Sequence, residues 1–266
     1  MKEMTFEEKV ERVKNFRPID DAFFEVLATN KEVCEEILRT ILEDSNLVVS
    51  EVITQKSEKN IYGRSVRLDA LCVLGDGTQC NVEVQRSDND DHLKRARYNA
   101  SVITARESNT GERFDEILEL YIIYISEFDF LKGKKTIYHL DKVLRETGKK
   151  VDDGLHEIFV NTAIDDNSDI AELMSCFTKK EVNNDKFPAF SKEVKRLKTT
   201  EGGVSTMCDV MEKYIQEGRD EGREDEILSS VADGDYSIKR GAEKLKITVE
   251  QFLEKMAQKG LTAPTE

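Results

Sequence analysis

The sequence predicts an α/β fold, with a mixed central sheet flanked by helices and a helical region at the C-terminal end. Three observations lead to it. Residues 66–85 contain two short β-like runs around a glycine-rich turn, which is the signal of a hairpin. The stretch ELYIIYIS at 119–126 is almost continuously apolar, as in a strand buried on both faces. Segments on both sides of these strands have apolar residues at helical spacing.

The first elements are helical. After a polar lead of residues 1–18, the segment IDDAFFEVLATNKEVCEEILRTIL begins at Ile19 and reads as two amphipathic helices. Asp20 stands at the start of the first helix, where aspartate is a favoured capping residue. A strand is expected next, at Leu47–Gln55, where the residues alternate between apolar and polar.

The hairpin that follows joins Val66–Leu74 to Thr78–Gln85. Asp69 interrupts the apolar pattern of the first strand, and an unpaired buried carboxylate is costly. A two-residue turn would pair Asp69 with Val84 and leave Glu83 on the far face of the sheet.

A three-residue turn, Gly75 to Gly77, pairs Asp69 with Glu83 instead, and this is the turn that we predict, with Gly77 in the left-handed region. The Cβ atoms of the two acids would then lie about 5 Å apart. Carboxylates this close repel each other unless a cation or a proton lies between them. The residue types suit magnesium. The alternative is an ordinary hairpin with a solvated polar face.

The segment HLKRARYNASVITARE, residues 92–107, is expected to be the most basic helix of the chain. Its inward positions would be Leu93, Ala96, Ala100 and Ile103. Its basic side chains, Lys94, Arg95, Arg97 and Arg106, either form a solvated face or, beside the acid pair, face a phosphate backbone.

Strands are expected at Glu119–Ser126, Lys135–Leu140 and Leu155–Thr162, with a charged connection at Asp141–Gly154. Beyond them the pattern turns helical, and no catalytic motif is present there. The helices are expected at Asp169–Phe177, Ser191–Lys198 and Ser205–Ile215.

The stretch EGRDEGRE, residues 217–224, repeats Glu-Gly-Arg, and glycine costs a helix ~1 kcal/mol relative to alanine. We therefore expect a frayed or hinge-like link there. Helices at Ser237–Leu245 and Thr248–Lys259 follow it. They could form a helix-turn-helix, but a helical hairpin that packs on a neighbour is favoured, because helix-turn-helix domains usually need a third helix.

Asp69, followed by Glu83-Val84-Gln85 on the next strand, resembles the acid and the acid-x-base pair of PD-(D/E)XK nucleases. More closely, the chain resembles the bacterial PD-(D/E)XK-family transposases, or Rpn-type recombination-promoting nucleases, in which glutamine typically replaces the lysine of the motif. The resemblance extends from about Ile19 to Thr162 and implies a restriction-endonuclease-like α-β-β-β-α-β core.

The resemblance implies a metal-dependent DNA endonuclease associated with transposition and recombination. Asp69 and Glu83 would hold Mg²⁺, with Mn²⁺ as a substitute, and Asp20 would be a third ligand, with Asp21 as its competitor. Gln85 would complete the catalytic set by orienting water. The alternative is a weak or inactive nuclease fold that binds DNA or a protein partner.

The basic helix carries the expected DNA contacts. Arg95 and Tyr98 match an Arg-x-x-Tyr pattern of the family, and Lys94 and Arg97 lie beside them in the sequence. Asn99 stands where the family often has a second aromatic residue, so base stacking is not expected there.

Composition limits the remaining possibilities. A net charge of −14 argues against a protein that coats nucleic acid non-specifically, although a local basic face remains compatible with it. The cysteines and histidines lack the spacing of zinc sites, and the chain shows neither a signal sequence nor a membrane-spanning run. We therefore expect a cytoplasmic protein with DNA as its partner, no membrane contact, and self-association, if any, through the C-terminal helices. The expected parts are 1–162 (nuclease-like core), 163–216 (helical extension) and 217–266 (helical tail).

Overall fold

The computed structural model describes residues 4–58, 66–88, 91–108, 111 and 113–262. Contacts divide the chain into two units, Met1–Cys208 and Asp209–Glu266, and each is described by itself. The expected division into three parts stays a prediction. No helix within the described ranges is both long and apolar enough to cross a bilayer.

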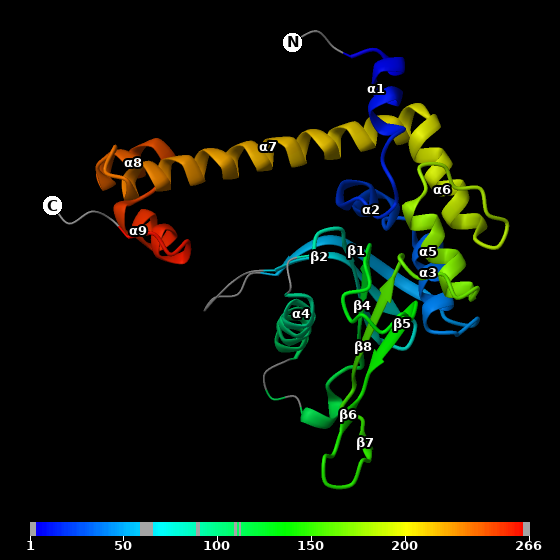
Figure 1. Ribbon diagram of the computed structural model, residues 1–266. Coiled ribbons are helices and arrows are strands. Elements are labelled where there is room, and N and C mark those ends of the chain that lie inside the picture. The colour runs from blue at the N-terminus through cyan, green and yellow to red at the C-terminus, as the bar shows by residue number, and fades with distance from the viewer. Residues whose placement is uncertain (1–3, 59–65, 89–90, 109–110, 112, 263–266) are drawn as a thin grey trace. The chain divides into compact units, whose positions relative to one another are not determined.

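A mixed sheet forms the centre of the first unit (Figure 1). Among the described residues it has six strands in the order β1-β2-β3-β4-β8-β5. The first three strands are antiparallel neighbours, β3, β4 and β8 are parallel, and β5 returns antiparallel to β8. The bounds are Val49–Glu58 (β1), Val66–Leu74 (β2), Gln79–Gln85 (β3), Leu120–Ser126 (β4), Ile137–Leu140 (β5) and Leu155–Asn161 (β8). This arrangement confirms the predicted α/β class and the strand order of the core.

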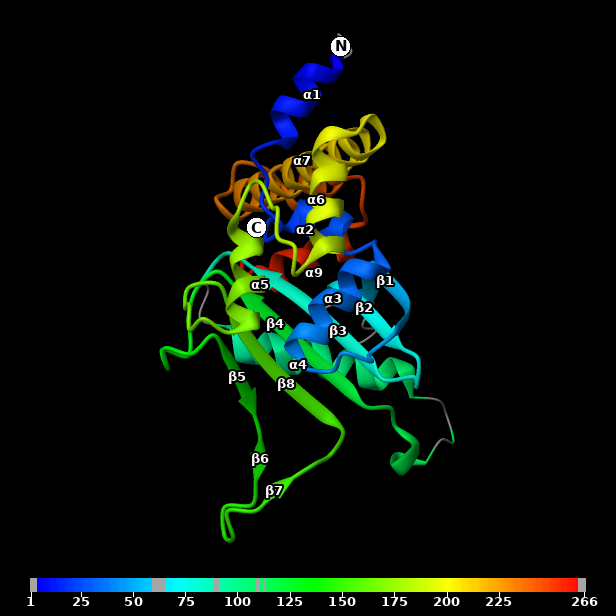
Figure 2. The ribbon, with the colours of Figure 1, turned by 90° about the vertical axis from the view of Figure 1, so that its right-hand side faces the viewer.

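Helices cover both faces of the sheet (Figures 1 and 2). Helix α4 lies on one face and forms the crossover between the parallel strands β3 and β4, a connection that parallel pairing requires. The helices of the other face are α3 (Lys31–Ile41), α5 (Asp169–Thr178) and α6 (Pro188–Thr199), and α2 (Asp21–Leu27) lies near the ends of β2 and β3.

Helix α4 spans His92–Glu107, as predicted, and its small residues allow it to lie close to the sheet. Ala96, Ala100 and Ile103 pack against apolar residues of β2, β4 and β8. The expectation for Leu93 was wrong, because its side chain is 43% exposed. The buried position in this first turn is taken by His92, whose ring binds the hydroxyl of Tyr124.

The hairpin has the predicted three-residue turn. The N–H of Leu74 donates to the carbonyl of Thr78 at 2.8 Å, which closes the loop around residues 75–77. Gly77 has φ +92°, a conformation that side chains with a Cβ rarely adopt. Cys72 and Cys80 lie opposite each other, buried and free, as the same register predicted.

Some elements of the first unit had not been predicted, among them a helix and a two-stranded ribbon. Helix α1 (Phe6–Val13) begins at a capping box in which Thr5 and Glu8 exchange hydrogen bonds, and it lies in the supposed polar lead. A two-stranded ribbon of β6 (Lys142–Val143) and β7 (Lys150–Val151) forms within the charged connection. We call residues 141–153 the arm.

The second unit is helical. It contains most of α7 (Glu201–Ala232) together with α8 (Ile238–Leu245) and α9 (Val249–Gln258). The expectation of a frayed link was wrong, because α7 continues as a helix through the glycines at 218 and 222. The pair α8 and α9 packs on the last turns of α7. Its core consists of Ile227, Leu228, Val231, Ala242, Phe252 and Met256.

Candidate metal and nucleic-acid site

Asp69 and Glu83 lie opposite each other on β2 and β3, on the face of the sheet that α4 covers. The register pairs Ala70 with Val82, so Asp69 and Glu83 are the next opposed pair, one residue further from the turn on each strand. The N–H of Asp69 donates to Oε1 of Glu83 at 3.4 Å, and the N–H of Val84 donates to Oδ2 of Asp69 at 3.0 Å. The structure thus places the two acids as the sequence predicted.

The two carboxyl groups resist ionisation. Burial raises the pKa of Asp69 to about 7, and the charges of Asp21 and Glu25 add to this effect. Burial, followed by the charge of Asp69, raises the pKa of Glu83 well above its ordinary range. A buried pair of this kind is stable only when a proton or a cation compensates the second negative charge.

Helix α2 presents its two candidate acids differently. The carboxylate of Asp20 makes no capping hydrogen bond and accepts instead from the N–H of Arg17 at 2.7 Å. It also forms an ion pair with Arg86 at 3.0 Å. Asp21, in contrast, is the acidic neighbour whose charge raises the pKa of Asp69 most. Of the two alternatives for a third ligand, Asp21 is thus the one whose charge acts on the acid pair.

Gln85 is held by the basic helix. Nη1 of Arg95 donates to Oε1 of Gln85 at 3.2 Å, and Nε2 of Gln85 donates to the carbonyl of Ser87 at 2.9 Å. The charge of Arg95 also lowers the pKa values of Asp69 and Glu83, against the effect of burial. Arg95 therefore brings positive charge to the acid pair itself. From the sequence alone, Arg95 had been expected only to contact a phosphate of DNA.

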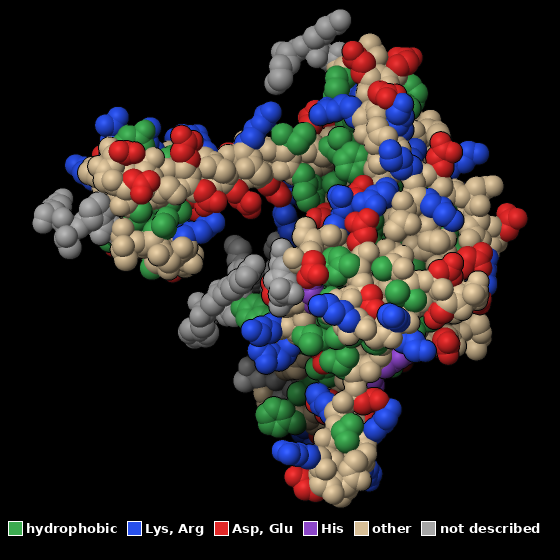
Figure 3. Space-filling view, viewed as in Figure 1, with side chains coloured by type: hydrophobic (Ala, Val, Ile, Leu, Met, Phe, Trp, Pro, Cys, Tyr) green, Lys and Arg blue, Asp and Glu red, His purple; other side chains and the backbone are tan. Residues whose placement is uncertain are grey.

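The other expected DNA contacts are distributed along α4. Lys94 and Arg97 are exposed, and lysine and arginine side chains gather over this helix (Figure 3). Burial raises the pKa of Glu157 on β8, and the charges of Lys142 and Arg97 oppose this rise, so Arg97 acts on a more distant strand than Arg95 does. Tyr98 is half-buried, while Asn99 is buried and does not offer a stacking surface.

Sequence reasoning missed one residue that contacts the pair and one that contacts Tyr124, the strand neighbour of Glu83. Asn81 is fully buried, and its Nδ2 donates to Oε1 of Glu83 at 2.9 Å. Strand alternation, which places both residues on one face, was a signal that could have identified it. His92 contacts Tyr124 through Nδ1 at 3.0 Å and Asp88 through Nε2 at 3.0 Å. No spacing in the sequence indicated this second set of contacts.

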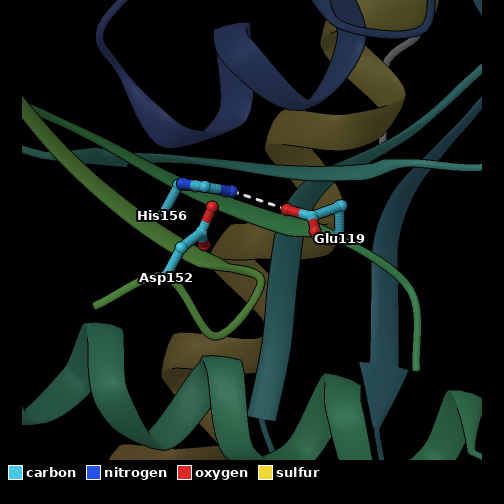
Figure 4. A group of neighbouring side chains, drawn as sticks. All are labelled: Glu119, Asp152 and His156. Atoms are coloured by element: carbon cyan, nitrogen blue, oxygen red, sulfur yellow. Dashed lines mark hydrogen bonds and ion pairs between the residues drawn. The ribbon is translucent and has the colours of Figure 1, made fainter. Parts of the chain in front are cut away.

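A separate group of possible metal ligands lies at another place on the sheet. Glu119, Asp152 and His156 come together so that one donor atom from each lies within 4.8 Å of the others (Figure 4). Tyr124, which is opposite Glu83, is five residues beyond Glu119, or about 16 Å along β4. The group is therefore distinct from the acid pair.

Comparison with known proteins agrees with this architecture. The family model of the PD-(D/E)XK nuclease family transposases matches residues 19–172, which is more than half of the chain. No curated protein and no solved structure matches the chain significantly. The match begins at the residue where the sequence had indicated the resemblance, and it includes the hairpin, α4 and β4. The chain belongs to the PD-(D/E)XK nuclease family transposases, and its function is nuclease-like and associated with transposition.

Proposed function

We propose that this protein is a metal-dependent endonuclease that hydrolyses phosphodiester bonds of DNA, with Mg²⁺ as its ion and Mn²⁺ as a substitute. The observation that carries the proposal is the opposed pair of Asp69 and Glu83, buried with raised pKa values between two strands. An ordinary solvated hairpin would keep such carboxylates exposed and ionised.

The donors of the site fit a hard divalent cation. Carboxylate oxygens of Asp69 and Glu83 are of the type that Mg²⁺ prefers, and Asp21 supplies a third from α2. A bound ion would offset the repulsion within the pair, polarise the scissile phosphate and lower the pKa of a water molecule. Asp20 is the weaker candidate for the third position, because two arginines already bind its carboxylate.

The surrounding residues position these groups. The N–H of Val84 fixes the carboxylate of Asp69, and Asn81 fixes that of Glu83. Gln85 orients the attacking water through its amide, as the glutamine of the motif requires. Arg95 lies beside it and stabilises the negative charge that develops on the phosphate, a task that lysine performs in the usual form of the motif.

DNA is the proposed substrate. Lys94 and Arg97 on the exposed side of α4, with Tyr98 beside them, would contact the phosphate backbone. This contact would be local, because the whole chain has a net charge of −14. The five cysteines are all buried and none of them forms a disulfide, which supports a cytoplasmic location. Self-association through the C-terminal helices stays a prediction.

The test is the conversion of supercoiled plasmid to nicked or linear DNA with Mg²⁺ or Mn²⁺, and with EDTA as the control. Glu83→Gln and Asp69→Asn should abolish conversion. Asp76→Asn, a change at the tip of the same hairpin, should leave it intact, because Asp76 is exposed and bonds only within the turn. Plasmid that is bound by the wild-type protein but stays supercoiled with either ion would support the inactive, DNA-binding alternative.

A further inference from the structure

The group formed by Glu119, Asp152 and His156 draws on three separate segments. Glu119 immediately precedes β4, Asp152 follows β7 at the base of the arm, and His156 lies on β8. Figure 4 shows the carboxylate of Asp152 beside the imidazole and the contact of Nε2 with Glu119 as a dashed line. None of these residues belongs to the nuclease site, and all three are accessible to solvent.

The imidazole is held in a fixed orientation. Its ring stacks on Tyr121, with centroids 4.3 Å apart and an angle of 22° between the planes. The two residues are cross-strand partners on β4 and β8. Nε2 of His156 lies 2.6 Å from Oε2 of Glu119. A ring fixed in this way loses little freedom when it binds a cation.

The backbone makes room for the acidic side chains. Gly154 has φ +80°, and a Cβ at this position would lie 3.3 Å from Oε1 of Glu119. The N–H of Gly154 donates to Oδ1 of Asp152 at 3.1 Å, so the turn that brings in Asp152 depends on the same glycine. The turn therefore holds the carboxylate of Asp152 and leaves room for that of Glu119.

The donor set differs from that of the nuclease site. A neutral imidazole with two carboxylates suits zinc and similar transition ions, whereas an all-oxygen set suits Mg²⁺. Two ligands at about 2.1 Å from one ion lie about 3.0–3.4 Å apart at tetrahedral or octahedral angles. The 2.6 Å contact between His156 and Glu119 would have to open by about 0.4–0.8 Å, which exposed side chains permit.

The arm gives such an ion a structural role. Residues 141–153 are all exposed, and their described ion pairs, Lys142 with Asp153 and Lys150 with Asp141, lie within the arm. Exposed pairs of this kind contribute little stability. An ion that joins Asp152 to Glu119 and His156 would connect the base of the arm to β4 and β8.

We propose that Glu119, Asp152 and His156 form a second metal site, which takes zinc or a similar transition ion and fastens the arm to the end of the sheet. The proposal does not depend on nuclease activity. A protein without activity could still bind the ion here, and an active nuclease could lack the site.

The first experiment is calorimetric titration of EDTA-treated protein with Zn²⁺. The protein carries Asp69→Asn and Glu83→Gln, so that the acid pair does not contribute. One equivalent should bind, and adding His156→Ala or Asp152→Asn should weaken binding by at least ~10-fold, because each removes a donor atom. His139→Ala, which removes an exposed histidine of β5, is the matched control and should have no effect. Equal binding by the His156→Ala and His139→Ala proteins would overturn the proposal.

The second experiment measures the rate at which a protease cleaves the arm. Trypsin can cut it at Lys142, Arg145, Lys149 and Lys150. Zn²⁺ should slow cleavage there in the protein with an intact site and should not slow it in the His156→Ala protein, which also controls for any effect of zinc on trypsin. Cleavage at the same rate with and without Zn²⁺ in the intact protein would show that no ion fastens the arm.

Discussion

Arg95 of α4 donates a hydrogen bond to Gln85 of β3, with Nη1 3.2 Å from Oε1. The glutamine stands where the nuclease motif ordinarily has lysine, and the arginine brings a positive charge to its amide. The positive charge that is missing from position 85 is thus present on the next helix along the chain. This relationship decides how the site should respond to substitution.

Gln85→Ala should lower plasmid cleavage by at least ~10-fold, because the water loses the amide that orients it. Mg²⁺ affinity, measured by calorimetry, should stay close to the wild-type value, since Gln85 is not one of the proposed ligands. Gln85→Lys should keep activity, because it adds a positive charge where the transition state gains negative charge. A wild-type cleavage rate in Gln85→Ala would show that this residue takes no part in catalysis.

Arg95→Ala should weaken DNA binding and also reduce cleavage of bound DNA, because this side chain lies beside Gln85 and the acid pair. The matched variant is Arg97→Ala, two residues away, at an exposed position whose charge acts on Glu157. Both variants should flatten the dependence of log K on log salt by about one unit. Only Arg95→Ala should slow cleavage at saturating protein in a single-turnover assay, and equal slowing in both variants would contradict the role given to Arg95.

Stability in EDTA should fall as the pH rises from about 5 to about 8. In the folded protein the pKa of Asp69 is raised to about 7 and that of Glu83 is raised as well, so the folded state holds more protons than the unfolded state in this range. The stabilisation is complete below the unfolded-state pKa values and is lost as the pH rises through the folded-state values. Thermal melts should show this loss in the wild type and less of it in Asp69→Asn with Glu83→Gln. Mg²⁺ should restore the wild-type Tm at pH 8, and a flat pH profile in EDTA would contradict the raised pKa values.

Gly77→Ala should destabilise the protein by about 1 kcal/mol, because alanine is strained at φ +92°. Gly75→Ala is the control in the same turn, since Gly75 has no positive φ and its added Cβ would meet nothing closer than 4.0 Å. Urea unfolding measures the free energy of unfolding of both variants. Equal losses from the two changes would show that the left-handed conformation of Gly77 is not what holds the turn.

The parts of the fold that depend on residues close in sequence could be predicted. Strand alternation and the glycines of the turn were enough to pair Asp69 with Glu83, because hairpin register depends on residues close in sequence. The bounds of β2 and α4 followed from apolar spacing in the same way. Helix α1 was missed because charged residues dominate its segment, although Phe6, Val10 and Val13 recur at helical spacing and the capping box was visible in the sequence.

The remaining parts depend on contacts between distant segments. Asp20 and Asp21 are neighbours in sequence, and only the packing of α2 gives Asp20 its ion pair with Arg86 and lets the charge of Asp21 raise the pKa of Asp69. Arg95 approaches Gln85 because α4 crosses the sheet, which periodicity does not reveal. The continuity of α7 through two glycines goes against intrinsic propensity, which is a weak guide in a long helix anchored by tertiary packing at its far end.

The mixed order of the strands has a consequence for the time at which the site forms during folding. The β2–β3 hairpin joins residues close in sequence, whereas β3 pairs with β4 only after the chain has passed through α4, as in the pairing of Gln79 with Leu120. Pairings between distant residues form later than local ones, because more chain entropy is lost in closing the loop. On a ribosome, the two acids would therefore meet before Arg95 is fixed beside them, and the proposed nuclease would gain its positive charge only as the sheet is completed.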